Sequence, residues 1–317
     1  NTTSSYGASY GDGDVIGVAL DLDAGTLIIY KNGASQGTLD STATSAMGSN
    51  GWSPHVSGYA SPNFKMNFGQ SAFAHTPPAG HKKLCTANLP EPTIVKGTDY
   101  FNTKLYTGQD TSSLYNVTGV GFQPDLVWGK ARDGSIPNIV FDAVRGDDKQ
   151  LETINGDAEV VRSSAAYRFL SDGFAVSTVG NLNNPKNYAA WCWKESATAG
   201  FDIVGYNGSE DSTISHSLGV SPELMIIKSR ESSNDWMVWH HIVVDANNKG
   251  LNLNKADGVF TSGSNTFIKA VSSSTFTLGS SAIVQDGGSN DYIAYLWSEV
   301  SGYSSFGQYH GNGDTDG

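Results

Sequence analysis

The chain has 317 residues, of which 38% are hydrophobic, 11% aromatic and only 16% charged, with 37 glycines and 10 prolines. This length allows two or three domains, and the many turn-forming residues favour an all-β chain. Thirty-one acidic against 19 basic residues give a formal net charge of −12, and no basic cluster stands out, which disfavours nucleic acid and anionic lipid as partners. The apolar runs are strand-sized, far short of the roughly 20 residues of a membrane helix.

The N-terminal part of the sequence predicts hairpins. Residues 15–22 are typical of a buried strand, 23–25 of a tight turn and 26–30 of the return strand, and a second turn follows at Lys31-Asn32-Gly33. A further strand is predicted over Phe64–Gly69, because apolar and polar side chains alternate there. The first residues show no basic start followed by an apolar core, so we expect no signal peptide.

Prolines predict a domain boundary between residues 76 and 98. Pro77, Pro78, Pro90 and Pro92 lie in this stretch, and proline removes a hydrogen-bond donor and biases its predecessor toward extended backbone. We therefore expect residues 1–75 to form one domain and residues 76–98 to form a linker. Cys85 and Cys192 have neither CxxC nor Cys/His spacing, which indicates structural thiols.

Beyond the linker the sequence repeats itself with a period of roughly 100 residues. Each unit is typical of a β-sandwich, because short strands alternate with turns rich in Gly, Asn, Asp and Ser. The matching sets are Leu105–Gly108, Gly205–Gly208 and Gln308–Gly311; Gly119–Arg132 and Ser217–Arg230; and Asn187–Trp193 and Asp291–Trp297.

The repeat predicts the domain organisation of the remaining chain. We expect superposable sandwiches at residues 99–198 and 199–300, with Pro124 and Pro222 at equivalent strand starts. Residues 301–317 are expected to form the first strand of a truncated third repeat, as in a segment of a longer polypeptide. Open edge strands, guarded by few lysines, are expected to be covered by neighbouring copies or domains.

Four stretches of the first 75 residues occur in an order that is specific to one family: Gly13–Asp23, Leu27–Gly33, Trp52–Val56 and Asn67–Gly69. In this order they resemble the C-terminal half of a SPRY domain, which is a concanavalin-like β-sandwich. The N-terminal half of that sandwich has no counterpart in the sequence. The fold class expected from residues and resemblance together is all-β, with tandem antiparallel β-sandwiches of which the first is a partial SPRY-like one.

The repeat units are similar to the domains that follow SPRY-like modules in tail and other structural proteins of bacteriophages, notably marine and cyanobacterial ones. Phe169–Phe174 and Gly302–Gly307 are typical of these domains. The resemblance implies a part of the virion surface, and its expected partners are other copies of the chain and other virion proteins.

Catalytic and metal-binding patterns are weak. His240 and His241 are expected to face opposite sides of a strand and so cannot share a metal. The pairs Asp12/Asp14, Asp21/Asp23 and Asp147/Asp148 lie at Gly-rich turns, where an aspartate bonds its own backbone. Arg145-Gly146-Asp147 matches a cell-attachment tripeptide, but a match of three residues occurs too readily by chance to indicate that function. We therefore expect no catalytic residue, no metal and no cofactor.

Aromatic residues beside polar ones give the better candidates for ligand binding, because sugar rings stack on indole or phenol while polar groups bond the hydroxyls. The tryptophans inside apolar strands are instead expected in the core: Trp128, Trp191, Trp193, Trp239 and Trp297. The expected ligand-binding residues are Trp52, His55, Tyr59 and Asn63 in one loop-rich stretch, and Asn234 with Trp236.

Three classes of function remain. The leading expectation is a structural virion protein of a bacteriophage, a tail-fibre-like appendage whose domains extend the particle and contact host-surface glycan. The alternatives are a carbohydrate-binding module in its own right and a glycan-cleaving enzyme, which the lack of a paired-acid cleft disfavours. Self-assembly, saturable sugar binding and release of reducing ends distinguish the three classes.

Overall fold

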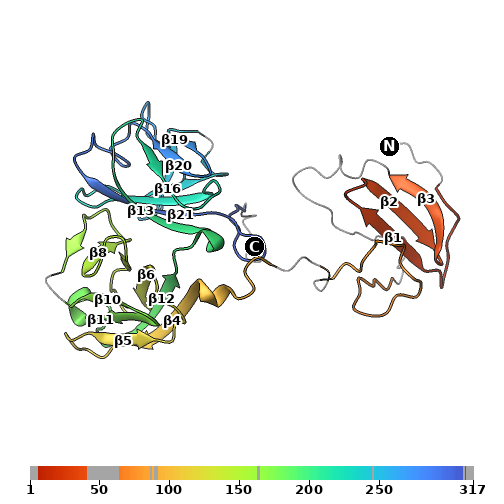
Figure 1. Ribbon diagram of the computed structural model, residues 1–317, viewed down its shortest axis with the longest axis horizontal. Helices are drawn as coiled ribbons and strands as arrows, with labels where there is room; N and C mark the ends of the chain where they lie inside the picture. The colour runs from red at the N-terminus through yellow and green to blue at the C-terminus, as the bar shows by residue number, and fades with distance from the viewer. Residues whose placement is uncertain are drawn as a thin grey trace. The chain divides into compact units, whose positions relative to one another are not determined.

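The computed structural model describes residues 6–40, 64–85, 88, 92–162, 165–244, 246–309 and 311. The chain divides into two compact units, Asn1–Glu91 and Pro92–Gly317, and each is described by itself. Both are built from antiparallel strands (Figure 1), so the all-β fold expected from the sequence is confirmed. Within the described ranges there is no helix with the length and hydropathy needed to cross a membrane.

The first unit contains the two hairpins that the sequence predicts. Its sheet has the order β1-β2-β3, with β1 at Ile16–Asp21, β2 at Thr26–Lys31 and β3 at Ala34–Asp40. The β1–β2 turn is held by Asp21, whose Oδ1 accepts the Ala24 N–H at 2.8 Å. Asn32 and Gly33 make the next turn with φ of 49° and 82°, as a tight hairpin turn requires.

The strand predicted over residues 64–69 is not formed, and this prediction is corrected. The segment is irregular, and Phe64, Met66 and Phe68 are exposed. The side chain of Asn67 explains the difference: its Nδ2 donates to the carbonyls of Ser71 and Ala72, and its Oδ1 accepts the Gly69 N–H at 3.0 Å. Such a local turn competes with a strand for the backbone groups.

The second unit begins with a short 3-10 turn, η3 (Gly97–Asp99), and holds two sandwiches with the same strand order. The first has the sheets β4-β12-β6-β7-β8-β9 and β10-β11-β5. Its elements are β4 (Phe101–Thr107), β5 (Tyr115–Thr118), β6 (Leu126–Ala131), β7 (Ile139–Asp142), β8 (Lys149–Glu152), β9 (Val160–Val161), β10 (Tyr167–Leu170), β11 (Gly173–Val176), η4 (Thr178–Gly180) and β12 (Asn187–Trp193).

The second sandwich follows a 3-10 turn, η5 (Ala197–Ala199). Its sheets have the orders β13-β21-β15-β16-β17-β18 and β14-β20-β19. Its strands are β13 (Phe201–Asn207), β14 (Thr213–Ser215), β15 (Leu224–Ser229), β16 (Met237–His240), β17 (Lys249–Asn252), β18 (Phe260–Thr261), β19 (Ile268–Val271), β20 (Thr275–Leu278) and β21 (Asp291–Trp297).

The two sandwiches correspond strand by strand, as the sequence repeat predicts. Pro124 and Pro222 are both buried and stand two residues before β6 and β15. The residues after them make the same bond, since the Asp125 N–H donates to the Trp193 carbonyl and the Glu223 N–H to the Trp297 carbonyl, each at 2.8 Å. Each sandwich has its own apolar core between its two sheets.

In each of the edge strands β4 and β13, an Asn or Asp side chain accepts a hydrogen bond from a backbone N–H group of the strand. Asn102 Oδ1 accepts the Thr103 N–H at 2.9 Å, and Asp202 Oδ1 accepts the Ile203 N–H at 3.0 Å. Asp202 is an inward-pointing charge, 3% exposed, which is a device that discourages edge-to-edge pairing. Coverage of the edges by neighbouring copies stays a prediction.

The described part of residues 301–317 forms no strand, unlike the expected first strand of a third repeat. Val300 and Ser304 form an isolated bridge, and Tyr309 is 93% exposed. A first strand pairs only with the last strand of its own sandwich in both complete repeats, and no such strand is paired with this segment.

Candidate functional site

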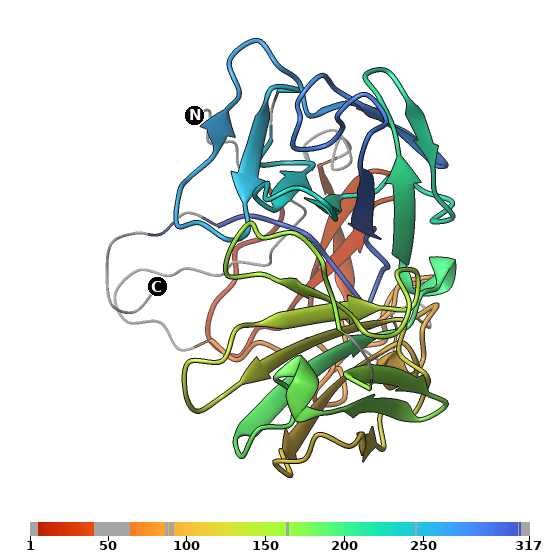
Figure 2. The same cartoon turned by 90° about the vertical axis from the view of Figure 1, so that its left-hand side faces the viewer.

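The outer faces of the two six-stranded sheets pack against each other, and we call this interface the seam. Strands such as β7 and β21 are apolar on both faces, so each sheet needs cover on both sides. Figure 2 shows the second sandwich, cyan to blue, above the first, yellow to green. The buried residues of the seam are Leu126, Val140, Leu151, Phe201, Ile203, Ile226, Trp236, Ile293 and Tyr295.

Equivalent tryptophans meet in the seam. The rings of Trp193 and Trp297, which end β12 and β21, lie 6.3 Å apart at 70°, in the edge-to-face arrangement that aromatic rings prefer. Trp128 also packs here, and Trp239 packs against the core of the second sandwich. Four of the five tryptophans expected in the core therefore pack against a buried cluster. All five, Trp191 included, are half-buried rather than fully buried.

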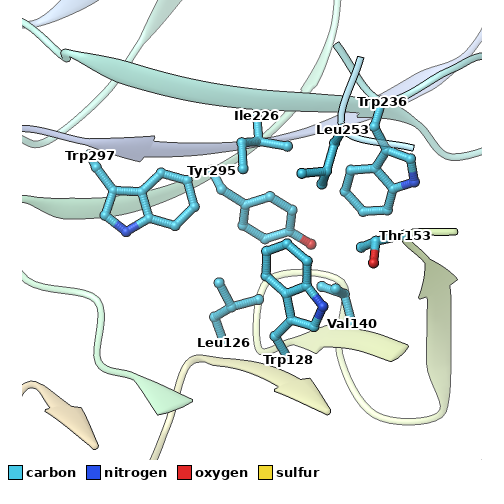
Figure 3. Close-up of a pocket in the computed structure, with 9 residues that line it drawn as sticks. All are labelled: Leu126, Trp128, Val140, Thr153, Ile226, Trp236, Leu253, Tyr295 and Trp297. Atoms are coloured by element: carbon cyan, nitrogen blue, oxygen red, sulfur yellow. The ribbon is translucent and has the colours of Figure 1, made fainter. Parts of the chain in front are cut away.

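A small cavity of about 10 Å³ lies within the seam. Figure 3 shows indole rings from both sandwiches around it. Such a volume holds about one water molecule, so this cavity does not admit a sugar ring. The hydroxyl of Thr153 is buried without a hydrogen-bond partner at its wall. The lining residues are Leu126, Trp128, Val140, Thr153, Ile226, Trp236, Leu253, Tyr295 and Trp297.

The structure corrects the expectation that Trp236 offers its ring to a ligand. Its side chain is 1% exposed, and its indole N–H donates to the Glu152 carbonyl of the other sandwich at 2.9 Å. Asn234 beside it is half-buried, and its Nδ2 donates to the Ala282 carbonyl. The other expected ligand residues lie outside the described residues: Trp52, His55, Tyr59 and Asn63.

A buried ion pair of the first sandwich lies at the apolar seam. The guanidinium of Arg145 has no exposed surface and lies 2.5 Å from Asp142 and 3.2 Å from Glu159. Tyr295 of the second sandwich donates its hydroxyl to Asp142 at 2.7 Å. Burial opposes the charge on Arg145, but the neighbouring anionic groups offset this and hold the pKa of the guanidinium above its usual value.

Glu159 extends this network to the second sandwich. Arg230 donates to Glu159 through Nε at 3.1 Å and Nη2 at 3.0 Å, and its Nη1 lies 3.4 Å from Asp291. The planar guanidinium matches both carboxylate oxygens, which fixes orientation as well as distance. Because Arg145 is bound in this network, the Arg145-Gly146-Asp147 tripeptide does not present its arginine at the surface.

Three carboxylates meet where the chain passes from one sandwich to the other. Asp125 Oδ2 accepts the Glu195 N–H at 2.7 Å, and Asp202 Oδ2 accepts the Ser217 N–H at 2.5 Å. Burial, followed by the neighbouring Asp202 and Asp125, raises the pKa of Glu195 to about 8. The group therefore holds a proton at neutral pH and lets the carboxyls approach one another.

The remaining candidates are structural. Asp14 accepts from Gly11 and Asn32, and these bonds lower its pKa to about 2, in agreement with the turn interpretation. Burial raises the pKa of the Cys192 thiol to about 12. Among the described residues, no group of His, Cys, Asp and Glu is arranged to hold a metal.

The prediction for His240 and His241 is wrong in one respect. Their rings do not point to opposite sides but lie 5.1 Å apart. The reason is that β16 ends at His240 and a turn follows, so the side-chain alternation of a strand stops there. Burial, and then the nearby His241, lower the pKa of His240.

Comparisons with known proteins place the sandwich pair in a family. Residues 96–317 match the family described as "Domain of unknown function (DUF7483)". The chain belongs to the DUF7483 family. Residues 1–71 match the SPRY domain, which is consistent with a concanavalin-like sandwich in the first unit. No curated protein and no solved structure matches the chain. The DUF7483 region therefore spans both sandwiches and the seam between them.

Sequence reasoning did not identify the ion pairs of the DUF7483 seam. Asp142 follows three apolar residues of β7, Arg145 lies in a turn and Glu159 in the irregular segment before β9, where charged side chains are ordinarily solvated. One feature of the sequence could have indicated a buried interface. The strands β7 and β21 lack a polar face. A sheet of that kind must be covered on both sides, and any charge at its border is then buried and paired.

Proposed function

We propose that the chain is part of a structural protein of a bacteriophage virion, in which the DUF7483 pair is a rigid body of a tail-fibre-like appendage. The observation that supports this most is the seam. It joins two sandwiches through buried aromatic rings and an internal ion network. Such an interface resembles a domain core rather than the polar contact of domains that move independently.

The sequence supplies the second support. Its repeat units are similar to the domains that follow SPRY-like modules in phage structural proteins, and the SPRY match precedes the DUF7483 match in this chain. The proposed location is the virion surface, and the proposed partners are other copies of the chain and other virion proteins.

Two segments at the borders of the DUF7483 pair lie close together. A Cβ placed on Gly97 would lie 3.1 Å from the Tyr303 ring, and one on Gly302 would lie 3.2 Å from Pro92. Residues 92–97 and residues 302–303 of the second unit therefore lie side by side.

Host-surface glycan recognition is proposed for the residues around Trp52, His55, Tyr59 and Asn63, since the Trp236 ring is enclosed. Replacing Tyr59 by alanine is expected to weaken adsorption to host cells while the melting temperature stays unchanged. A matched control is Trp236→Ala, which is expected to lower the melting temperature because it empties part of the seam. Unchanged adsorption by the folded Tyr59→Ala variant would remove this recognition surface from the proposal.

The experiment that tests the virion proposal is immunogold electron microscopy. Antibodies raised against the purified chain are applied to particles of the phage that encodes it. Gold on an appendage is the expected result, and particles that carry none of the protein would overturn the proposal. Saturable sugar binding by the isolated chain, with no label on particles, would favour a stand-alone carbohydrate-binding module. Release of reducing ends would favour a depolymerase.

A further inference from the structure

The outer face of the large sheet of the first sandwich extends beyond the seam. Strands β4, β12 and β6 pair so that Thr103, Trp191 and Trp128 lie side by side on this face. The next residue in this row is Val140 of β7, which is buried in the seam. Trp128 is half-buried and lines the seam cavity (Figure 3), Trp191 is half-buried, and Thr103 is exposed. The row therefore leads out of the seam into a part of the sheet face that the second sandwich leaves open.

The corresponding face of the second sandwich is covered. Tyr295 holds the position of Trp191 in the repeat, and it is 2% exposed. Its hydroxyl donates to Asp142, the last residue of β7 in the first sandwich. The two sheets thus meet off-centre, because β21 is covered while part of β12 stays open. The aromatic residue in this open part, Trp191, is not among those that pack against the seam or the first core.

The open part of the face is uncharged. It is formed by Thr103, Leu105, Thr107, Ala189 and Trp191, and Leu105 is 58% exposed. Among the described residues, the indole N–H of Trp191 and the hydroxyl of Thr103 have no hydrogen-bond partner, and the indole N–H is not a buried group. A sugar ring stacks its C–H face on an indole and bonds its hydroxyls to polar groups beside it. The open face supplies both kinds of group.

The size of this face fits a short saccharide better than a protein. Strands β4 and β12 have seven residues each, so together they cover about 24 Å by 10 Å of the sheet, or about 240 Å². A stable interface between proteins buries about 800 Å² on each partner. The second sandwich borders the face at one end, where the Trp193 ring lies 6.3 Å from the rings of Phe201 and Trp297. The open area is therefore not larger in that direction.

We propose that this open face, which we call the Trp191 face, binds an uncharged saccharide. One sugar ring lies flat on Trp191, and its hydroxyls bond to Thr103. An anionic saccharide or nucleic acid is disfavoured, because the face has no cation and the chain has a net charge of −12. The Trp191 face belongs to the DUF7483 pair and is distinct from the stretch around Tyr59. The inference does not depend on the proposed virion function.

The test is isothermal titration calorimetry of the full chain with cellohexaose, laminarihexaose and mannohexaose, and with a hyaluronan hexasaccharide as the anionic comparison. We expect saturable binding of at least one neutral glycan, and Trp191→Ala is expected to weaken it about tenfold or more. Trp191→Phe keeps a ring and is expected to retain most of the affinity. Thr103→Asp, at an exposed position, places a charge beside the ring and is expected to weaken binding without disturbing the core. This variant tests the face even where Trp191→Ala does not fold.

The matched control is Tyr309→Ala, which removes an exposed aromatic ring outside the Trp191 face and is expected to leave the affinity unchanged. No saturable binding of any neutral glycan would overturn the proposal, as would binding that Trp191→Ala and Thr103→Asp leave unchanged. Binding lost only in Tyr59→Ala would place the saccharide in the first unit and would also overturn it. Self-association in sedimentation that Trp191→Ala abolishes would assign the face to a second copy, against the proposal.

Discussion

Replacing Arg145 by methionine removes the central cation of the seam while it keeps much of the side-chain volume. Asp142 then keeps the Tyr295 hydroxyl, and Glu159 keeps two bonds from Arg230. Breaking a buried pair by removing one partner costs about 3–5 kcal/mol, and these remaining bonds place the expected cost near the lower end, about 3 kcal/mol. For a unit of this size that corresponds to a fall in melting temperature of about 6–12 °C.

The matched control is Arg168→Met. Arg168 lies 2.9 Å from Asp148 and 3.5 Å from Asp147, but its side chain is 38% exposed. An exposed pair of this kind contributes about 0–1 kcal/mol, so this variant is expected to unfold within a few degrees of the parent chain. Thermal and urea unfolding followed by circular dichroism measure both variants. An Arg145→Met variant no less stable than Arg168→Met would refute the reasoning about the seam.

Three further variants probe the same region. Thr153→Val removes a buried hydroxyl without a partner and is expected to raise the free energy of unfolding by about 1–2 kcal/mol. In the same urea titration the control Thr103→Val, at an exposed position, is expected to leave this free energy unchanged. Trp236→Ala is expected to cost about 3–5 kcal/mol, and a loss under 1 kcal/mol would contradict its enclosure. The folded state holds the Glu195 proton up to about pH 8, whereas the unfolded carboxyl releases it near 4.5. The free energy of unfolding therefore falls as pH rises between these values. Glu195→Gln is expected to reduce this pH dependence, whereas the control Glu299→Gln, at an exposed position, is expected to leave it unchanged.

Local patterns were sufficient to predict much of the fold. The turn residues Asn32 and Gly33 adopt the positive φ angles of a tight hairpin turn, and such residues are readable without tertiary information. The repeat of about 100 residues predicted two similar sandwiches because each strand kept its place in the order. The prediction of a strand over residues 64–69 failed because the hydrogen bonds of one asparagine side chain to nearby backbone outweigh the alternation of apolar and polar residues.

The seam was not predictable in the same way. Trp236 sits between Asp235 and an apolar strand, so its sequence neighbours fit an exposed ring as well as an enclosed one. Its burial depends on the other sandwich, whose Glu152 carbonyl lies far away in sequence. The Glu159–Arg230 ion pair has the same origin, because its two residues belong to different sandwiches and come together only when the two sheets meet. The hydrogen bond between Arg145 and Tyr295 also depends on this meeting. Contacts between side chains of separate sheets produce no periodic pattern in the sequence of either strand.

The measurement that tests the account most directly is native-state hydrogen exchange of the full chain and of Arg145→Met. If the seam joins the sandwiches into one cooperative unit, core amides of β7 and β16 exchange with the same free energy of opening. Both values then fall together in the variant, by about 3 kcal/mol. Different opening free energies in the two sandwiches, with a fall confined to β7, would contradict the central claim that the seam locks the pair.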